Sequence, residues 1–398
     1  MRNEIVAPGP ARAAERAESA RQTAPPPGDT PGSGPHGPSA LGPEGAAPRR
    51  VGPHAARPAP APRPGPGWRR AYAALDLGTN NCRLLIAEPS PYGFRVIDAF
   101  SRIVRLGEGL GRADSLSDEA IERTIDALAV CRGKMQTRGV SRAKIIATEA
   151  CRLAVNGPAF VERVHREVGL DLEVVDRRTE AYLAVTGCAS LADRHAESVV
   201  IFDIGGGSTE IVWLDGSAAL ARSADPTRRI RAWDSLPVGV VTLAERYGGA
   251  NVTRTVFEAM VEEVADRLTK FALIAGAAAA APAFHLLGTS GTVTTLAAMH
   301  LRLPRYDRRR IDGLWMTDDE VSASIDHLLD TRLAERAQNP CIGRDRADLV
   351  LAGCAILEAI RRAFPSDRLR IADRGLREGL LMNMMREDGV WRRGGRSS

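Results

Sequence analysis

Two short segments place an aspartate just before a turn of small residues. Residues 74–88 read ALDLGTNNCRLLIAE and residues 201–215 read IFDIGGGSTEIVWLD. When they are aligned without gaps, Asp76 matches Asp203 and apolar residues match on both flanks. Hard divalent cations prefer carboxylate oxygens, and backbone N–H groups in such turns can surround an anion. The repeat therefore indicates chemistry on a metal-bound phosphate.

The second copy carries three successive glycines. Glycine has no Cβ, so backbone N–H groups there can approach an anion closely. Asp203 is suited to hold Mg²⁺ (or Mn²⁺), directly or through water, and Glu210 can return toward the same cation. A plain glycine-rich hairpin is the alternative, but the paired copy favours ligand binding. The predicted metal ligands are Asp76, Asp203 and Glu210, and the predicted phosphate-binding residues here are Gly205, Gly206, Gly207, Ser208 and Thr209.

The first copy would hold the same phosphate from the opposite side. Its predicted phosphate-binding residues are Gly78, Thr79, Asn80 and Asn81, although an Asn-rich turn can also stabilise itself. A third candidate is Ser290, Gly291 and Thr292, which follow an apolar stretch and open a predicted helix. Backbone amides at a helix start can bind phosphate, and an ordinary N-cap is an equally good interpretation.

Each copy reads as a β-hairpin with a carboxylate at its mouth, followed by alternating helices and strands. This pattern predicts an α/β fold of two duplicated domains with mixed sheets, and a cleft between them into which both turns point. The predicted elements after the first copy are helices 117–138, 158–168 and 179–192 and strands 143–148 and 172–176. After the second copy they are strands near 218–236, at 284–288 and at 368–372, and helices 253–275, 291–300, 317–330, 345–362 and 375–386.

Composition limits the folded part of the chain. Residues 1–67 hold 16 of the 25 prolines and no Phe, Tyr or Trp. Such a segment cannot offset its chain entropy by burying apolar groups, so we expect it to be disordered. We place domain I at 68–190, domain II at 191–385 with its last helix packing back on domain I, and a basic flexible tail at 386–398.

The formal charge of +5 comes from the two tails. Residues 1–67 carry 8 Arg against 5 acidic residues and residues 386–398 carry 4 against 2, which leaves 42 basic and 42 acidic residues between them. A neutral body argues against specific nucleic-acid binding. The dense basic run 302–310 is interpreted as a solvated loop, with a substrate-facing strip as the alternative.

Six scattered cysteines without a Cys-x-x-Cys pair favour a reduced, cytoplasmic compartment and argue against a zinc site. The N-terminus has no apolar signal region. The apolar run 271–287 is broken by Pro282, so we expect a helix end, a turn and a strand there and no membrane span.

Four further segments, 147–154, 174–181, 290–292 and 375–379, together with the two aspartate-bearing turns resemble the motifs of one known protein family. The chain resembles the exopolyphosphatase and guanosine pentaphosphate phosphohydrolase (Ppx/GppA) family, within the actin-like ATPase superfamily of duplicated RNase H-like domains. That family shows Asp-Leu-Gly-Ser-Asn-Ser, Ala-Thr-x-x-x-Arg-x-Ala, Ile-Ile-Ser-Gly-x-Glu-Glu-Ala, Asp-Ile-Gly-Gly-Gly-Ser-Thr-Glu, Ser-Gly-Thr and Gly-Leu-Arg-Glu-Gly. The similar segments here, in the same order, are 76–81, 147–154, 174–181, 203–210, 290–292 and 375–379.

The resemblance implies a metal-dependent phosphohydrolase that releases terminal orthophosphate from inorganic polyphosphate or guanosine pentaphosphate. It implies that Glu180 is the general base that activates water and that Arg152 clamps phosphate oxygens. A helix-dipole partner is the alternative for Glu180, and a structural salt bridge is the alternative for Arg152. The oligomeric state does not follow from the sequence, and a homodimer is compatible with it.

The chain also departs from the family pattern. Thr179-Glu180 stands where the family has Glu-Glu, and Asp176-Arg177 stands where it has Ser-Gly, so Arg177 and Arg178 adjoin the expected base. Longer relatives carry additional helical domains, and a two-domain form suggests a shorter substrate. A catalytically slow polyphosphate or nucleotide sensor of the same fold is the second hypothesis. An actin-like sugar or acid kinase is the third.

Overall fold

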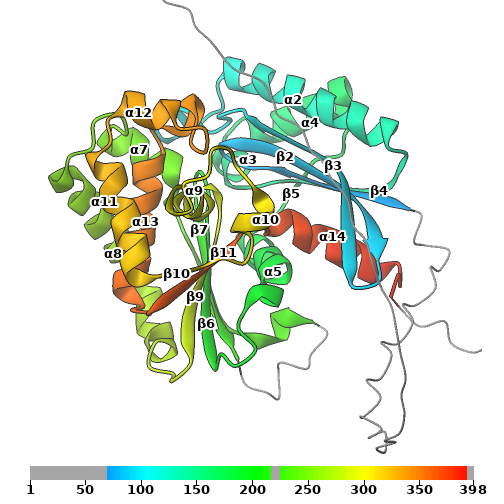
Figure 1. The fold of residues 1–398 in the computed structure, drawn as a ribbon. Helices are drawn as coiled ribbons and strands as arrows, with labels where there is room; N and C mark the ends of the chain where they lie inside the picture. Colours follow the sequence, from blue (N-terminus) through cyan, green and yellow to red (C-terminus); the bar gives the residue numbers. More distant parts are fainter. Residues whose placement is uncertain (1–69, 217–224, 392–398) are drawn as a thin grey trace, which may run out of the picture. The chain divides into compact units, whose positions relative to one another are not determined.

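The computed structural model describes residues 70–216 and 225–391. The predicted tail 1–67 lies outside the described residues, as does the segment 392–398 of the predicted C-terminal tail. All described residues belong to one compact unit, within which two sheets form two halves (Figure 1).

The first half is built on a sheet of order β3-β2-β1-β4-β5 among the described residues. Its strands are β1 (Ala71–Leu77), β2 (Asn81–Ser90), β3 (Gly93–Ile103), β4 (Val140–Ala147) and β5 (Glu173–Val174). Strands β1 to β3 are antiparallel neighbours, and β4 runs parallel to β1. Helices α2 (Asp118–Thr137) and α4 (Gly157–Val168) pack apolar side chains against one face of this sheet.

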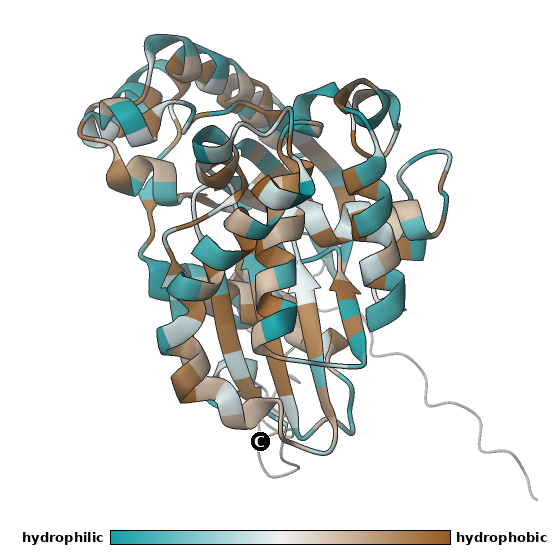
Figure 2. Cartoon of the chain, turned by 90° about the vertical axis from the view of Figure 1, so that its left-hand side faces the viewer, coloured by the Kyte–Doolittle hydropathy of each residue, from teal (hydrophilic) through white to brown (hydrophobic). Residues whose placement is uncertain are grey.

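The second half repeats this order with one more strand, β10-β11-β9-β6-β7-β8. Its strands are β6 (Ser198–Ile204), β7 (Thr209–Asp215), β8 (Ile230–Leu236), β9 (Phe284–Thr289), β10 (Trp315–Thr317) and β11 (Arg368–Ala372). Helices α8 (Arg254–Ala275), α9 (Gly291–His300) and α13 (Val350–Ala363) share the main core with this sheet. Figure 2 shows mostly hydrophobic strands in this sheet. The predicted duplication of the α/β fold is confirmed.

Local sequence signals explain where several helices begin. Ser117 caps α2 by accepting a hydrogen bond from Ala120 N, and two acidic residues follow it in the first turn. Thr253 caps α8 in the same way. Thr317 begins α11 with a full capping box. The remaining helices are α1 (Leu110–Ala113), α3 (Glu149–Leu153), α5 (Arg177–Cys188), α7 (Val240–Tyr247), α10 (Arg308–Ile311), α11 (Asp318–Asp330), α12 (Leu333–Gln338) and α14 (Leu376–Glu387).

Two helices link the halves by exchanging sheets. Helix α5 follows the first sheet in sequence, but its residues Ala181, Val185 and Cys188 pack against β6, β7 and β9 of the second. Helix α14 follows the second sheet, but packs against β1 and β2 of the first. The helices also touch each other, since a Cβ on Gly379 would lie 2.2 Å from Leu183 O. Helices α5 and α14 therefore each contact both halves of the molecule.

The folded part continues past the expected start of the C-terminal tail at residue 386. Helix α14 extends to Glu387, and the Asp388 carboxylate accepts a hydrogen bond of 2.7 Å from the Tyr72 hydroxyl. Trp391 packs against the apolar side chains that α14 shares with β1 and β2, and its Nε1 donates a hydrogen bond to Ser90 O at 2.8 Å. These hydrogen bonds and the packing of Trp391 hold residues 386–391 against the first sheet.

In the described residues, no helix combines the length and the apolar character that crossing a membrane requires. The apolar run 271–287 is divided between the end of α8, a short 3-10 turn and the start of β9, as its composition predicts.

Candidate active site

The two aspartate-bearing turns have the same geometry. Gly78 N donates to Asn81 O at 2.9 Å in the first turn, and Gly205 N donates to Ser208 O at 2.9 Å in the second. In the flanking strands, Asp76 lies opposite Arg83, and Asp203 lies opposite Glu210. The sequence repeat is thus a structural repeat down to the register of each hairpin.

The two turns are in contact across the cleft. A Cβ on Gly206 would lie 2.9 Å from Thr79 Cβ and 3.1 Å from Asn80 N. A Cβ on Gly207 would lie 2.7 Å from Thr79 Oγ1. Glycine is required at these positions by the close approach of the first turn, in addition to any approach of a ligand.

One central cavity is lined by both turns and by the start of α9. Its wall includes Asp76, Asp203, Glu180 and Glu210, and every predicted phosphate-binding residue except one. The exception is Thr209, which is fully buried and donates its hydroxyl hydrogen to Val238 O at 2.7 Å. Ser290 lines the cavity while its hydroxyl also accepts a hydrogen bond from Thr292 N, so it caps α9 as well.

Several backbone donors in the turns are available to a ligand. Within the described parts of the chain, the N–H groups of Thr79, Asn80, Gly206 and Gly207 donate no hydrogen bond. Buried N–H groups normally find a partner, and successive free ones form a concave site for an anion. The cavity is therefore suited to oxygen-rich anions such as phosphate.

Four carboxylates around the cavity have raised pKa values. Burial, together with the charge of nearby Asp76, raises the pKa of Asp203 to about 6. Burial and the charge of Asp203 raise the pKa of Glu210 to about 7, although Ser208 and Ser235 each donate a hydrogen bond of 2.8 Å to its Oε1. Burial also raises the pKa values of Asp76 and Glu180. Concentrated negative charge of this kind is relieved by a cation.

The donor set fits a divalent cation of the Mg²⁺ type. Within the described residues, the carboxylates of Asp76 and Asp203 accept no hydrogen bond, and the buried Oδ1 of Asn80 has no partner. No group of three or more His, Cys, Asp or Glu side chains in the described ranges could hold an ion by itself. Mg²⁺ commonly takes one or two carboxylates and completes its shell with water and phosphate oxygens, which matches this arrangement.

Glu180 lies in the first turn of α5, which Asp176 begins by accepting a hydrogen bond from Thr179 N at 2.7 Å. Arg152 Nη2 donates to Glu180 Oε2 at 2.8 Å. Arg152 also donates to Glu149 Oε2 and, through Nη1, to Val175 O. The structure thus places Arg152 differently from the predicted phosphate clamp. Its nitrogens donate to protein acceptors and it does not line the central cavity, so in this structure it is an ion-pair partner of Glu180.

Three arginines around the site were not among the predicted ligands. Arg83 and Arg346 line the central cavity, and Arg377 lines an adjoining cavity that shares Asp76 and Asp203 with it. Within the described residues, none of the three pairs with a carboxylate in a salt bridge. Burial lowers the pKa values of Arg346 and Arg377, with the charge of Arg83 contributing to both. Unpaired, partly buried guanidinium groups favour a bound anion.

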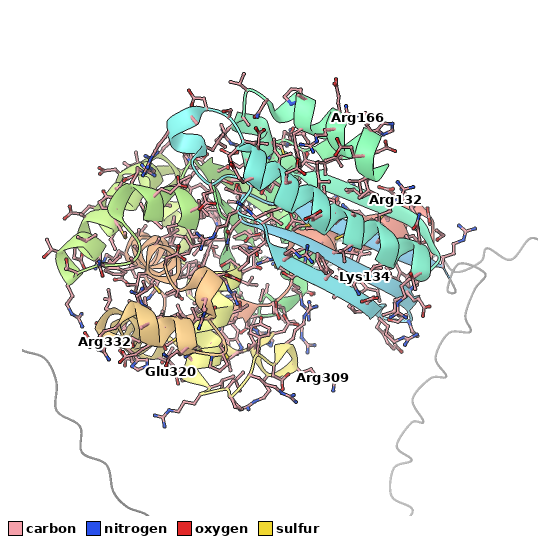
Figure 3. The ribbon with its side chains drawn as sticks, turned by 90° about the horizontal axis from the view of Figure 1, so that it is seen from above. Arg132, Lys134, Arg166, Arg309, Glu320 and Arg332 are labelled. Atoms are coloured by element: carbon pink, nitrogen blue, oxygen red, sulfur yellow. The ribbon has the colours of Figure 1, made fainter. Side chains whose placement is uncertain are left out.

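The basic run 302–310 divides between two environments. Tyr306 lines the adjoining cavity and donates to Asp373 at 2.7 Å, and Arg308 pairs with Glu378 at 2.7 Å. Arg305, Arg309 and Arg310 are exposed. Figure 3 shows Arg309 at the periphery. Most of the run is therefore solvent-exposed, as predicted, although its last residues begin α10, and Tyr306 contributes to a cavity wall.

Comparisons with known proteins agree with this geometry. The model of the Ppx/GppA phosphatase family matches residues 85–388. A crystal structure of an Aquifex aeolicus member of that family is 30% identical, with a TM-score of 0.65, and the match covers 80% of this chain and 98% of that one. A Cytophaga hutchinsonii exopolyphosphatase structure has a TM-score of 0.71, covers 81% of this chain and 99% of that one, and at 22% identity supports the fold alone.

A bifunctional 3-dehydroquinate synthase/phosphatase of Fusobacterium nucleatum is 27% identical over 316 residues. The match covers 76% of this chain but only 44% of that relative. The chain therefore spans less than half the length of this curated relative.

Proposed function

Because the chain belongs to the Ppx/GppA phosphatase family, whose members hydrolyse phosphoanhydride bonds, we propose that it releases terminal orthophosphate from inorganic polyphosphate or guanosine pentaphosphate. The fold is the duplicated actin-like arrangement of that family. The observation that carries the proposal is a cavity in which free backbone N–H groups and unpaired arginines surround buried carboxylates.

The donors of the cavity bind the charged end of the substrate. The N–H groups of Thr79 and Gly206 approach the terminal phosphate from opposite turns, and Arg83 and Arg346 neutralise its charge. The adjoining cavity with Arg377 receives the next phosphate groups. Because this arrangement contacts oxygens and charge, it accepts a phosphate chain irrespective of what the chain is attached to.

Asp76 and Asp203, with Glu210 nearby, would hold a Mg²⁺ (or Mn²⁺) ion. When bound, the ion neutralises charge on the phosphate oxygens and fixes their orientation. The protein's own part is to present the carboxylates of Asp76 and Asp203 without competing hydrogen bonds. The unpaired Oδ1 of Asn80 accepts a hydrogen bond from water in the same space.

Glu180 acts as the general base. Burial and the charge of Glu210 raise the pKa of Glu180, which brings a carboxylate nearer to the operating pH of a base. One water proton moves to Glu180 as the water oxygen bonds to the terminal phosphorus. The P–O bond to the next phosphate breaks, and its electron pair leaves on the oxygen of the shortened chain. Arg152 keeps the Glu180 carboxylate in one orientation throughout.

The test is phosphate release by the purified protein with Mg²⁺. We expect orthophosphate from polyphosphate or guanosine pentaphosphate, and we expect Glu180→Gln to lower kcat by about a thousandfold, because general-base catalysis supplies ~10²–10⁴ in rate. Thermal unfolding and substrate binding of Glu180→Gln should be preserved, which separates lost chemistry from lost fold.

Other outcomes would support other functions. Tight binding of either compound without release by the unaltered protein would support a sensor, the hypothesis raised by Thr179 in place of the family's glutamate. Transfer of phosphate from ATP to a small acceptor would support a kinase. Homodimer formation, a cytoplasmic location and the absence of specific nucleic-acid binding stay as predictions, which sedimentation, fractionation and mobility-shift measurements would check.

A further inference from the structure

Glu149 is a buried carboxylate that the reaction described above does not use. It opens α3, its residue is 2% exposed, and it does not line the central cavity. It accepts hydrogen bonds from two arginines. Arg152 donates through Nε at 3.0 Å and Nη2 at 2.7 Å, and Arg177 donates through Nε at 3.2 Å and Nη2 at 2.6 Å.

These contacts form a continuous chain of alternating charge that ends on the expected base. Arg177 contacts Glu149, Glu149 contacts Arg152, and Arg152 contacts Glu180 at 2.8 Å. A buried carboxylate is costly unless it is paired and hydrogen-bonded. Burial raises the pKa of Glu149, but the hydrogen bonds from Arg177 and Arg152 outweigh this and hold its pKa below the ordinary value.

The two arginines share the charge of Glu149, and this sharing leaves Arg152 free to serve Glu180. Arg152 Nη2 divides its donation between Glu149 Oε2 and Glu180 Oε2. Without Arg177, Glu149 would depend on Arg152 alone and would attract a larger share of it. Arg152 Nη1 donates to Val175 O at 2.6 Å, which anchors that side of the guanidinium group. A small rotation of Arg152 about this anchor changes the direction of its hydrogen bond to Glu180.

Arg177 stands where the family pattern has glycine, so its partnership with Glu149 is an addition within this chain. Arg178, the next residue, provides a natural comparison. It lies over the Tyr182 ring at 5.1 Å and donates weakly to the Tyr182 hydroxyl, and it contacts none of the four charged residues.

We propose that Arg177 and Glu149 are positioning residues that orient Glu180 through Arg152. This inference rests on the proposed function, because it assigns the purpose of the network to the base of that reaction. Neither residue lines the cavity, so both act on the chemical step and leave substrate binding unchanged.

The experiment measures kcat and KM for polyphosphate hydrolysis with Mg²⁺ in Arg177→Ala, Arg177→Lys, Glu149→Gln and the Arg177→Ala/Glu149→Gln double variant. Arg178→Ala is the matched control, since it removes the same side chain type one residue away. We expect Arg177→Ala to lower kcat about tenfold with KM unchanged, which is less than the ~100-fold that a full 1 Å misplacement can cost, because Arg177 acts through two intervening residues. Arg177→Lys should recover part of the loss, and Arg178→Ala should match the unaltered protein.

The double variant tests whether Arg177 acts through Glu149. In the Glu149→Gln background, Arg177→Ala should cost less than twofold, because the intermediate carboxylate is already gone. Additive losses, an increase in KM in place of the fall in kcat, or an equal loss in Arg178→Ala would overturn the inference. Unfolding temperatures of all variants identify any that are simply misfolded, and Arg177→Lys is the variant that should remain folded.

The two levels of the proposal fail differently. If the unaltered protein releases phosphate and Arg177→Ala is unaffected, the inference fails and the proposed function stands. If the unaltered protein releases none, the proposed function fails and takes the inference with it.

Discussion

The two hairpins at the centre of the molecule share their register but differ in charge. In the first, Asp76 lies opposite Arg83, so the pair is formally neutral. In the second, Asp203 lies opposite Glu210, so the pair carries two negative charges when ionised. Both halves have the same frame, and this one cross-strand position places a guanidinium beside the first aspartate and a second carboxylate beside the other.

The surroundings of each hairpin reinforce this difference. Arg83 and Arg377 oppose the rise that burial causes in the pKa values of both Asp76 and Asp203. Glu210 on the second hairpin, in contrast, has only the hydroxyls of Ser208 and Ser235 as hydrogen-bond donors. We therefore expect the first hairpin to act mainly on the phosphate chain and the second mainly on the metal ion.

The most direct test of this difference neutralises Arg83 and Glu210, the two cross-strand partners, in separate variants. Arg83→Gln should raise KM for the phosphate substrate about tenfold or more, because a charge-assisted hydrogen bond contributes roughly 1.5–3 kcal/mol. The Mg²⁺ concentration that the Arg83→Gln variant needs for half-maximal rate should not change. Glu210→Gln should raise the Mg²⁺ concentration needed for half-maximal rate about tenfold and change KM for substrate less.

Steady-state rates on a grid of substrate and Mg²⁺ concentrations separate the two effects. Arg95→Gln is a suitable control, since Arg95 is exposed on β3 and pairs with Glu88 near the far end of β2, away from the turn that carries Asp76. If both variants change the same parameter, the division of roles between the hairpins is wrong.

A smaller effect is expected from the glycines of the two turns. A Cβ on Gly206 would lie 2.9 Å from Thr79 Cβ, whereas a Cβ on Gly78 would find its nearest atom, Asn81 O, at 3.7 Å. Gly206→Ala should therefore destabilise the contact between the turns by about 1–3 kcal/mol, as overpacking does. Gly78→Ala should be close to neutral. Denaturant unfolding measures both, and equal losses would show that the turns are not in contact in solution.

The hairpins and helices that carry the site could be predicted from the sequence, because short-range sequence patterns specify them. The ungapped match around Asp76 and Asp203 gave both hairpins, and caps such as Thr253 and Thr317 marked helix starts to within a residue. Strand β3 was missed, because most of its side chains are partly or fully exposed and carry no clear apolar alternation. The exchange of α5 and α14 between sheets was only partly anticipated, since it depends on contacts between distant segments.

The details of the site depend on where each side chain points. Alternation along β7 would have excluded Thr209 once Glu210 was assigned to the cavity, because neighbouring residues of a strand face opposite sides. The same rule would have found Arg83 from Asn81, two residues earlier on β2. The contribution of Arg346 could not be foreseen, because it lines the same cavity as Arg83 although more than half of the folded chain separates the two in sequence. The destination of Arg152 depended on Glu149 and Arg177, whose pairing no local motif shows.

The smallest expected effect concerns pH. The carboxyls of the second hairpin ordinarily titrate near 4, but in the folded protein the pKa is about 6 for Asp203 and about 7 for Glu210. The folded state therefore holds these protons more tightly than the unfolded state. Their stabilising contribution is complete below about pH 4 and is lost as pH rises through 6 to 7. A metal ion replaces the protons, so it should stabilise the protein most where they have left.

We accordingly expect the rise in Tm caused by Mg²⁺ to be on the order of 5 °C at pH 8 with a hundredfold excess over Kd, and to be much smaller at pH 5. Other carboxylates change the baseline equally with and without metal, so the difference between the two curves isolates the site. Asp203→Asn should flatten that difference, because it removes one of the carboxyls whose protons the metal ion replaces. A Mg²⁺ effect that is as large at pH 5 as at pH 8 would mean that the cation binds away from the second hairpin.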